Sequence, residues 1–430
     1  MDLKNVSVMI DGYNLRLPQG SGIKSYGLTL IRALEGLGAD VSLLMDRRKP
    51  RDRVPELGEV LFFDARQELQ KAGYRGLHLA AKALSLLIGL FRPEEIRLNR
   101  VIIDERYGGV ASVRKFYNLQ NCYELANGLF QTMQLVTRIR LPGRVDIWHA
   151  TYPLPIKVSK VRKVTTIHDL VPLRLPYTTL DDKSFFYQIV KESIKNSDLI
   201  ITVSNNTKND LMLIYNIDPN KIVVTYQPIL IDGYSQLLWL VNLVLRKYEL
   251  GCRKYVLFVG NIEPKKNVAR IIEAFAGIET DISLVIVGRK AWLWEDQIGR
   301  AEALLGKSRC KRHFKLLDYI PREDLEILYA NALFFIYPSL YEGFGLPPLE
   351  AMSCGCPVIS SNISSLPEVC GDAALYVDPY DVGDIRAKME SLLSDESLRR
   401  QLAEKGQKRV EFFNMPSYQQ RLYDAYSRVL

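Results

Sequence analysis

Short apolar runs recur along the chain at spacings that suit alternating strands and helices. Continuous apolar runs of this kind are typical of strands buried on both faces of a parallel sheet. They lie at residues 6–11, 41–44, 145–149, 163–167, 198–203, 255–260, 282–289, 314–317 and 333–337. Helical patterns separate several of them, including residues 20–37 and, after Ser204 as an N-cap, residues 205–215. The pattern predicts an α/β fold built from βαβ units.

One stretch, residues 341–357, follows such an apolar run and is rich in glycine and proline. Gly343 and Gly345 let the backbone bend closely around another group, and the two prolines that follow suit the first positions of a helix. Gly355 ends that helix about two turns later. The N–H groups of residues 344–346 therefore point outward at a positive helix end, which predicts an anion site.

Two carboxylates flank this anion site. Glu342 precedes the helix and Glu350 lies within its first turns, where we expect the helix dipole to favour the charged form. Glu350 could accept two hydroxyl hydrogen bonds, as an acidic residue does from a ribose in dinucleotide folds. A phosphate site beside such a carboxylate predicts a bound sugar nucleotide. The alternative is an ordinary strand-to-helix loop with a solvent-facing glutamate.

Other polar residues follow predicted strands, where ligands of open parallel sheets bind. His149 and His168 come at the ends of two strands in the first half, although a single histidine is more often structural than catalytic. Lys265 and Lys266 occupy a strand-to-helix loop in the second half, where two ammonium groups can neutralise a diphosphate. Their alternative role is that of ordinary surface lysines.

The central stretch resembles a known family. Glu342 and Glu350 reproduce the E-x7-E motif of retaining GT-B glycosyltransferases of family 4, and the surrounding EGFGLPPLEAMSCGCPVIS is similar almost residue for residue. The resemblance covers nearly the whole chain and weakens between about residues 50 and 140. It implies two Rossmann-like domains whose parallel sheets face each other across a cleft. The expected parts are an acceptor-binding domain at 1–230, a sugar-nucleotide domain at 231–415, and a helix at 416–430 that crosses back to the first domain.

The resemblance also implies the site residues. IHDLVPLRLP is similar to the stretch with the family's active-site histidine, which gives His168 a catalytic role beside Glu342. VGNIEPKKN resembles the phosphate-binding loop, with Lys266 on the family's lysine. Asn261 stands where many members carry arginine, so we expect Lys265 to supply that charge. The other donor-binding candidates are Gly22, Gly260, Gly288, Tyr319, Ile320, Gly343, Phe344, Gly345, Leu346 and Glu350.

The net charge of +8 is unevenly distributed. Residues 1–230 hold 32 basic and 23 acidic residues (+9), whereas residues 231–430 hold 25 and 26 (−1). A basic first half suggests an anionic partner for that half alone. No nucleic-acid recognition motif accompanies the charge, so a membrane surface or a phosphate-bearing acceptor fits better.

The cysteines, the N-terminus and the apolar segments indicate in which compartment the protein works. The six cysteines form no C-x-x-C pair and are expected to be reduced thiols. We expect no cleavable signal peptide at the N-terminus, because Asp2 and Lys4 lead straight into a strand. No apolar run reaches the roughly 20 residues that are needed to span a bilayer. We therefore expect a cytoplasmic protein. Peripheral contact with the inner face of the membrane is an alternative that the sequence leaves open. Residues 77–91 are predicted to form a core, acceptor-groove or interfacial helix, and 236–241 to pack between the domains.

The expected activity is retaining transfer of a hexose, with mannose as the leading candidate, from a nucleotide sugar to a glycan or polyprenyl-linked glycan during surface polysaccharide assembly. GDP-mannose is the leading donor and a UDP-hexose the alternative; no other cofactor and no metal is expected, because the chain lacks a D-x-D triplet. Two rival functions remain: a sugar-nucleotide epimerase or phosphorylase of the same architecture, and a non-catalytic sugar-nucleotide-binding protein.

Overall fold

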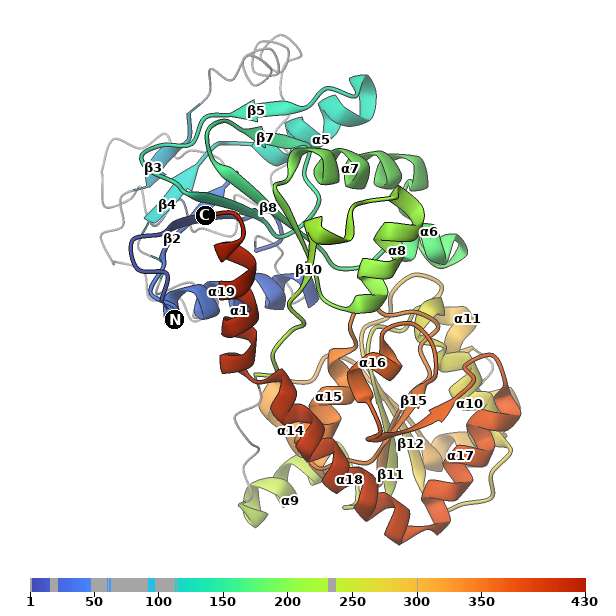
Figure 1. Ribbon diagram of the computed structural model, residues 1–430. Coiled ribbons are helices and arrows are strands. Elements are labelled where there is room, and N and C mark those ends of the chain that lie inside the picture. Colours follow the sequence, from blue (N-terminus) through green and yellow to red (C-terminus); the bar gives the residue numbers. More distant parts are fainter. Residues whose placement is uncertain are drawn as a thin grey trace.

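The computed structural model describes residues 2–15, 22–47, 60, 62, 92–96, 113, 115–230, 237–299 and 301–430. The apolar stretch predicted at 77–91 lies outside the described residues, as does the boundary predicted at residue 231. Figure 1 shows two lobes, one above the other, joined by the C-terminal helices.

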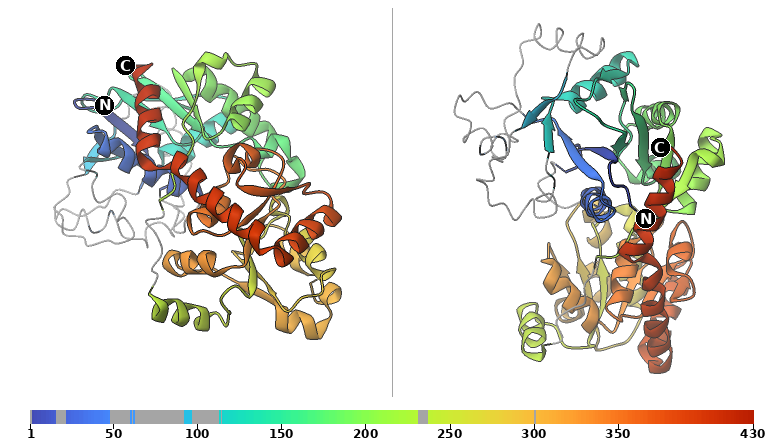
Figure 2. Two further views of the ribbon diagram at one scale, coloured as in Figure 1. Left: turned by 60° about the horizontal axis from the view of Figure 1, so that its bottom comes forward. Right: turned by 60° about the vertical axis from the view of Figure 1, so that its left-hand side comes forward.

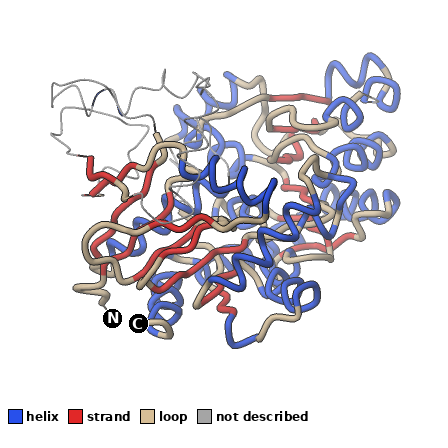
Figure 3. The backbone as a smooth tube through the Cα atoms, turned by 90° about the horizontal axis from the view of Figure 1, so that it is seen from above, coloured by secondary structure: helices blue, strands red, loops and turns tan. Residues whose placement is uncertain are grey.

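The upper lobe is built on an eight-stranded sheet with the order β10-β9-β8-β6-β1-β2-β4-β3. Its strands are β1 (Ser7–Asp11), β2 (Asp40–Met45), β3 (Glu94–Ile96), β4 (Lys115–Asn118), β6 (Ile147–Ala150), β8 (Arg162–Ile167), β9 (Leu199–Thr202) and β10 (Ile222–Val224). The central strands are buried, as the continuous apolar runs predicted. Figure 3, which looks onto this lobe, shows these strands side by side with helices flanking them.

Helices and a small second sheet complete the upper lobe. The helices are α1 (Gly22–Gly36), α5 (Cys122–Met133), α6 (Val171–Arg174), η2 (Pro176–Thr178), α7 (Lys183–Asn196), α8 (Asn205–Tyr215) and η3 (Pro219–Lys221). β5 (Thr137–Ile139) and β7 (Ile156–Val158) pair in parallel. The predicted N-cap at Ser204 is present, since its side chain accepts a hydrogen bond from the N–H of Thr207.

The lower lobe contains an all-parallel six-stranded sheet with the order β13-β12-β11-β14-β15-β16. Its strands are β11 (Tyr255–Val259), β12 (Ser283–Val287), β13 (Phe314–Leu317), β14 (Phe334–Tyr337), β15 (Val358–Ser361) and β16 (Ala374–Val377). Its helices are α9 (Leu238–Lys247), η4 (Pro264–Lys266), α10 (Val268–Ala276), α11 (Trp294–Ile298), α12 (Ala301–Leu305), α13 (Lys307–His313), α14 (Arg322–Asn331), α15 (Leu346–Ser353), α16 (Leu366–Cys370), α17 (Val382–Ser394) and α18 (Glu396–Val410).

The end of the chain runs from the lower lobe to the upper one (Figure 2). After α18, the short η5 (Glu411–Phe413) turns into α19 (Met415–Ser427), which packs against α1. The amide of Gln419 donates to the carbonyl of Ala33 at 3.2 Å. The α/β class and the parallel sheets agree with the sequence prediction.

One edge strand departs from the parallel pattern, since β3 pairs antiparallel with β4. The sequence of residues 104–140 reads as helical, but its described part contains β4 and β5 as well as α5. The expectation that residues 236–241 pack between the domains was wrong. α9 lies at the outer edge of the lower lobe and not between the domains (Figures 1 and 2). Within the described parts, no helix has the length and apolar character needed to cross a membrane.

Candidate active site

The stretch predicted to be central joins β14 to α15. Gly345 has a φ of 105°, a left-handed conformation that favours glycine, and it stands at the N-cap of α15. Pro347 and Pro348 occupy the first turn, and the helix ends at Ser353 before Gly355 (φ 69°). The N–H groups at this helix start lie where the sequence predicts an anion.

Glu342 is held at the centre of a polar cluster. Lys266 Nζ lies 2.5 Å from Glu342 Oε1, and the Ser339 hydroxyl donates to the same oxygen at 2.6 Å. The Tyr337 hydroxyl donates to it at 3.1 Å. Burial opposes the charged form of Glu342, but Lys266 and Lys265 outweigh burial and lower the pKa of this carboxyl. Glu342 is therefore an anchored carboxylate.

Lys265 adds a second ammonium group beside the first. Burial and Lys266 disfavour its charged form, but Glu342, Asp169 and Glu263 outweigh them and raise the pKa of Lys265. Its nitrogen lies 3.5 Å from Glu263 Oε1. The two lysines and the two glutamates balance one another in charge, so an incoming diphosphate must compete with carboxylates for the ammonium groups.

The glycines predicted at the donor site allow two loops to touch. Gly260 follows β11 and Gly288 follows β12, and a Cβ on Gly288 would overlap the carbonyl of Gly260. The N–H of Gly260 donates to the carbonyl of Val287 at 2.9 Å. Asn261 is exposed directly after this contact. These residues share the carboxyl edge of the lower sheet with Lys265 and Lys266.

Two of the donor-binding candidates, Tyr319 and Ile320, differ in their surroundings. Tyr319 is 69% exposed, and the Arg289 guanidinium lies 5.7 Å from the centre of its ring. Ile320 is buried in the core. Of the two, only Tyr319 has an exposed side chain.

His168 comes directly after β8, at the carboxyl edge of the upper sheet. Its Nε2 lies 3.0 Å from the carbonyl oxygen of Thr151. Because a carbonyl only accepts, Nε2 carries the proton and Nδ1 of the neutral ring is the acceptor. The ring meets Tyr26 edge to face at 4.7 Å. Burial lowers the pKa of His168, which favours this neutral form.

The two sheet edges meet at Gly343. A Cβ on Gly343 would overlap the carbonyl oxygen of His168, so only glycine allows this approach. The Ser204 hydroxyl donates to the carbonyl of Gly343 at 2.6 Å, and the Thr207 hydroxyl donates to the carbonyl of His168 at 3.0 Å. The catalytic candidates of the two lobes, His168 and Glu342, thus belong to neighbouring segments.

Glu350 is half-buried on α15. It accepts a hydrogen bond from the Tyr329 hydroxyl at 3.2 Å. Burial, although opposed by Arg322 and Tyr329, raises the pKa of Glu350. The expectation that the helix dipole dominates was therefore wrong, because Glu350 lies beyond the first turn of α15.

Phe344 and Leu346 contribute backbone at this helix start, and Phe344 also contributes packing. The Phe344 ring is buried and lies 5.5 Å from that of Phe413. It helps to hold the lobes together while its N–H remains at the helix start. Gly22 is the first residue of α1 and is exposed, one turn before Tyr26.

Two polar residues near His168 have structural partners. His149, which follows the same pattern in the sequence, bonds to the hydroxyls of Tyr426 at 2.6 Å and Thr166 at 2.8 Å, and burial lowers its pKa to about 3. Asp11, which the sequence analysis did not single out, accepts from the N–H of Thr151, and burial raises its pKa to about 6. A lone acid at the end of an apolar strand was the available signal for Asp11.

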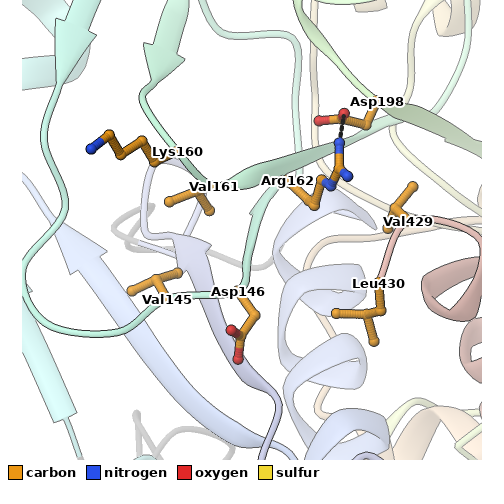
Figure 4. A pocket seen from close by; sticks show the side chains of 8 residues that line it. All are labelled: Val145, Asp146, Lys160, Val161, Arg162, Asp198, Val429 and Leu430. Atoms are coloured by element: carbon orange, nitrogen blue, oxygen red, sulfur yellow. Dashed lines mark hydrogen bonds and ion pairs between the residues drawn. The ribbon is translucent and has the colours of Figure 1, made fainter.

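A separate pocket of about 480 Å³ lies at the opposite edge of the upper sheet (Figure 4). It is lined by Val145, Asp146, Lys160, Val161, Arg162, Asp198, Val429 and Leu430. Arg162 and Asp198 form an ion pair at 3.1 Å. None of the predicted site residues lines this pocket. Among the residues that the structure describes, no group of His, Cys, Asp and Glu could hold a metal ion.

Known proteins resemble both halves of the chain. Residues 246–409 match the family described as Glycosyl transferases group 1, and residues 20–232 match Glycosyltransferase Family 4. O-antigen chain mannosyltransferase B of Escherichia coli is 35% identical over 290 residues, which cover 65% of this chain and 74% of that protein. Serotype-specific mannosyltransferase WbdA of E. coli is 31% identical over 265 residues, or 59% of this chain and 32% of WbdA.

The fold is that of solved glycosyltransferases. Sucrose-phosphate synthase from Thermosynechococcus elongatus superposes with a TM-score of 0.67 at 16% identity, over 99% of both chains. The two α/β lobes and the two family matches agree with one another. The chain belongs to the family 4 glycosyltransferases and has their GT-B fold.

Proposed function

We propose that this glycosyltransferase moves mannose, with retention of anomeric configuration, from a nucleotide sugar to a glycan during assembly of a surface polysaccharide. Its mannosyltransferase relatives support the sugar and the class of product. GDP-mannose is the proposed donor, with a UDP-hexose as the alternative. The acceptor is a glycan chain, free or carried on a polyprenyl lipid.

The observation that carries the proposal is the grouping of two lysines, a helix start and an anchored carboxylate. Lys265 and Lys266 lie beside Glu342, which directly precedes the loop into α15. Two ammonium groups and a positive helix end suit a diphosphate whose negative charge grows as the sugar leaves. Stabilising that charge is the electrostatic part of the proposed catalysis.

The other residues are assigned to parts of the donor. Glu342 and His168 hold the sugar that is transferred, and Glu350 accepts hydrogen bonds from the ribose hydroxyls. Tyr319 offers its exposed ring to the base. The neutral His168 presents Nδ1 as an acceptor, so it suits a sugar hydroxyl as donor.

The proposed transfer takes place on one face of the sugar. The bond from the sugar C1 to the diphosphate oxygen breaks as the bond from C1 to the acceptor oxygen forms on the same face. The departing phosphate oxygen takes the acceptor's proton, so no protein nucleophile is required. We propose that Lys265, Lys266 and the start of α15 supply the positive charge that a divalent ion supplies in other transferases.

A transfer assay with mannose donors tests the proposal. Purified protein, GDP-mannose and a mannose-terminated oligosaccharide should give an elongated product with an α-linkage, and the reaction should continue in excess EDTA. Activity lost in EDTA and restored by manganese contradicts the metal-independent charge assignment. Turnover of the donor without any acceptor favours the epimerase or phosphorylase, and nucleotide binding without turnover across an acceptor panel favours the non-catalytic protein.

We also propose that the enzyme works in the cytoplasm at the inner face of a membrane, where a polyprenyl-linked glycan would be presented. The +9 charge of residues 1–230 supports an anionic surface or a phosphate-bearing acceptor. Flotation with lipid vesicles at low and high salt distinguishes a lipid surface from a diffusible acceptor.

A further inference from the structure

α9 carries an apolar face that the rest of the described chain leaves uncovered. Leu238 is 78% exposed, Trp239 66% and Leu243 58%. Val244 and Leu245, near the end of the helix, are buried. α9 projects from the edge of the lower lobe, far from the upper one, in Figure 1 and in the right-hand view of Figure 2.

The exposed side chains lie on the solvent side of the helix. Trp239 and Leu243 are four residues apart and therefore neighbours on the surface. Leu238 is the first residue of α9 and lies about 140° around the helix axis from Leu243, at the edge of this side. α9 has no acidic residue and ends in Arg246 and Lys247. This combination of leucine, tryptophan and terminal cations is typical of helices that lie in a membrane interface.

The segment after the helix adds to its positive charge. Residues 237–254 contain four basic side chains and one acidic one, a net charge of +3. The acid, Glu249, is paired with Lys315 at 2.8 Å, and Lys247 with Asp324 at 2.6 Å. Among the described residues, no carboxylate forms an ion pair with the remaining cations, Arg246, Arg253 and Lys254.

The size of the face argues against a second copy of the chain as its occupant. A helix of ten residues is about 15 Å long, and three side chains on one side of it cover far less than the roughly 800 Å² per partner of a stable interface. A lipid interface has no such minimum, because each inserted apolar side chain and each cation beside anionic headgroups adds to binding separately.

We propose that α9, with Arg246, Arg253 and Lys254, binds the surface of an anionic lipid bilayer. Leu238, Trp239 and Leu243 enter the boundary between headgroups and acyl chains, while the cations remain at the headgroups. This contact deepens the proposed membrane location and rests on it, but it depends on neither the donor nor the acceptor.

The position of α9 leaves the donor site open. Lys315 Nζ donates to the carbonyl of Glu249 at 2.9 Å, which places the end of α9 beside β13 near that strand's amino end. The donor-binding loops follow the carboxyl ends of β11 and β12 in the same sheet. A membrane on α9 therefore faces the opposite edge of the sheet from Lys265 and Lys266.

The test is flotation with vesicles made of phosphatidylcholine and phosphatidylglycerol in equal parts, and of phosphatidylcholine alone. The full chain should float with the anionic vesicles only. The triple variant L238S/W239S/L243S should bind them about tenfold less or weaker still, and R246E/K254E should lose binding to a similar degree. The matched control L180S/L213S, on residues 74% and 71% exposed in the upper lobe, should float like the parent.

Tryptophan fluorescence reports the contact directly. Adding anionic vesicles should shift the emission to shorter wavelength, and W239F should still float but lose that shift. Transfer to a soluble oligosaccharide should be unchanged in the triple variant, so the membrane contact of α9 and the proposed transfer reaction can fail independently. The proposal is overturned if the parent does not float, if the triple variant floats equally well, or if sedimentation shows a dimer that the triple variant abolishes.

Discussion

Glu350 and His168 serve different parts of the donor in the proposed site, and their removal should have different effects. Glu350→Ala should weaken the nucleoside diphosphate by about 1.5–3 kcal/mol, the usual loss for hydrogen bonds to a charged group. His168→Ala should leave that affinity nearly intact and lower turnover of the full donor. Titration calorimetry with the bare diphosphate, beside transfer rates, measures both. If Glu350→Ala binds the diphosphate as tightly as the parent, the nucleotide does not lie on α15.

The raised pKa of Glu350 adds a dependence on pH. Its ionised form is the better acceptor for ribose hydroxyls, and protonation of this half-buried carboxyl begins at a higher pH than for an exposed glutamate. Affinity for the nucleoside diphosphate should therefore fall as the pH is lowered toward the raised pKa. In Glu350→Gln, which has no such proton to bind, that fall should be smaller. Parallel pH profiles for the parent and Glu350→Gln would contradict the assignment.

Substitution of Gly343 tests the contact between the carboxyl edges of the two sheets. Because a Cβ would overlap the carbonyl of His168, Gly343→Ala should force the segments apart, lower the stability by about 1–3 kcal/mol and reduce kcat/KM. Gly128→Ala is the control, since Gly128 is an exposed helical residue with no atom within 4 Å of the added Cβ; it should stabilise the chain by about 0.5–1 kcal/mol. Thermal unfolding measures the change in stability of both variants, and transfer rates measure the change in kcat/KM. Unchanged kinetics in Gly343→Ala would count against a close approach of His168 and Glu342.

At the scale of elements, α16 of the lower lobe caps α8 of the upper one. The Glu368 carboxylate accepts from the N–H groups of Asn205 at 2.8 Å and Asn206 at 3.1 Å. Glu368→Ala should cost about 1 kcal/mol, enlarge the radius of gyration in solution scattering and raise the KM for the donor. Asp182→Ala removes a cap within the upper lobe, on the N–H of Phe185, and should cost similar stability at unchanged dimensions. Identical scattering from both variants would contradict a role for the contact between Glu368 and α8 in holding the two lobes together.

The contact of Glu368 with α8 also shows what a local sequence pattern does not predict. The S-x-x-E spacing of Ser365 and Glu368 has the form of a capping box, but the Ser365 side chain does not cap α16. The Ser365 hydroxyl donates to the carbonyls of Glu342 at 2.9 Å and Phe344 at 2.7 Å, while Glu368 binds a helix 163 residues away. The apolar strands and α15 were predictable because their signals lie within a few residues of one another. Contacts between the lobes carry no such local signal.

At the scale of the whole molecule, the apolar pattern predicted an α/β fold, and the family resemblance implied two lobes and a final helix that crosses back. α19 does lie on α1. The pairing of His149 with Tyr426, 277 residues apart, could not be inferred, because a histidine at the end of a strand can face a ligand or pack against a distant helix. The hydrogen bond from Tyr329 to Glu350, which joins two different helices, likewise has no local sequence signal.

The connection through α19 determines how the molecule should unfold. Buried apolar side chains of both lobes form one continuous cluster that includes Phe413, Tyr418 and Leu422. Two-domain proteins often unfold in separate steps, but a shared core couples the steps, so a single calorimetric transition is expected here. Leu422→Ala should cost about 2–5 kcal/mol and separate the transition into two, whereas Leu430→Ala, at the exposed end of the chain, should leave it single. Two well-separated transitions in the parent would show that the lobes are energetically independent despite the shared core.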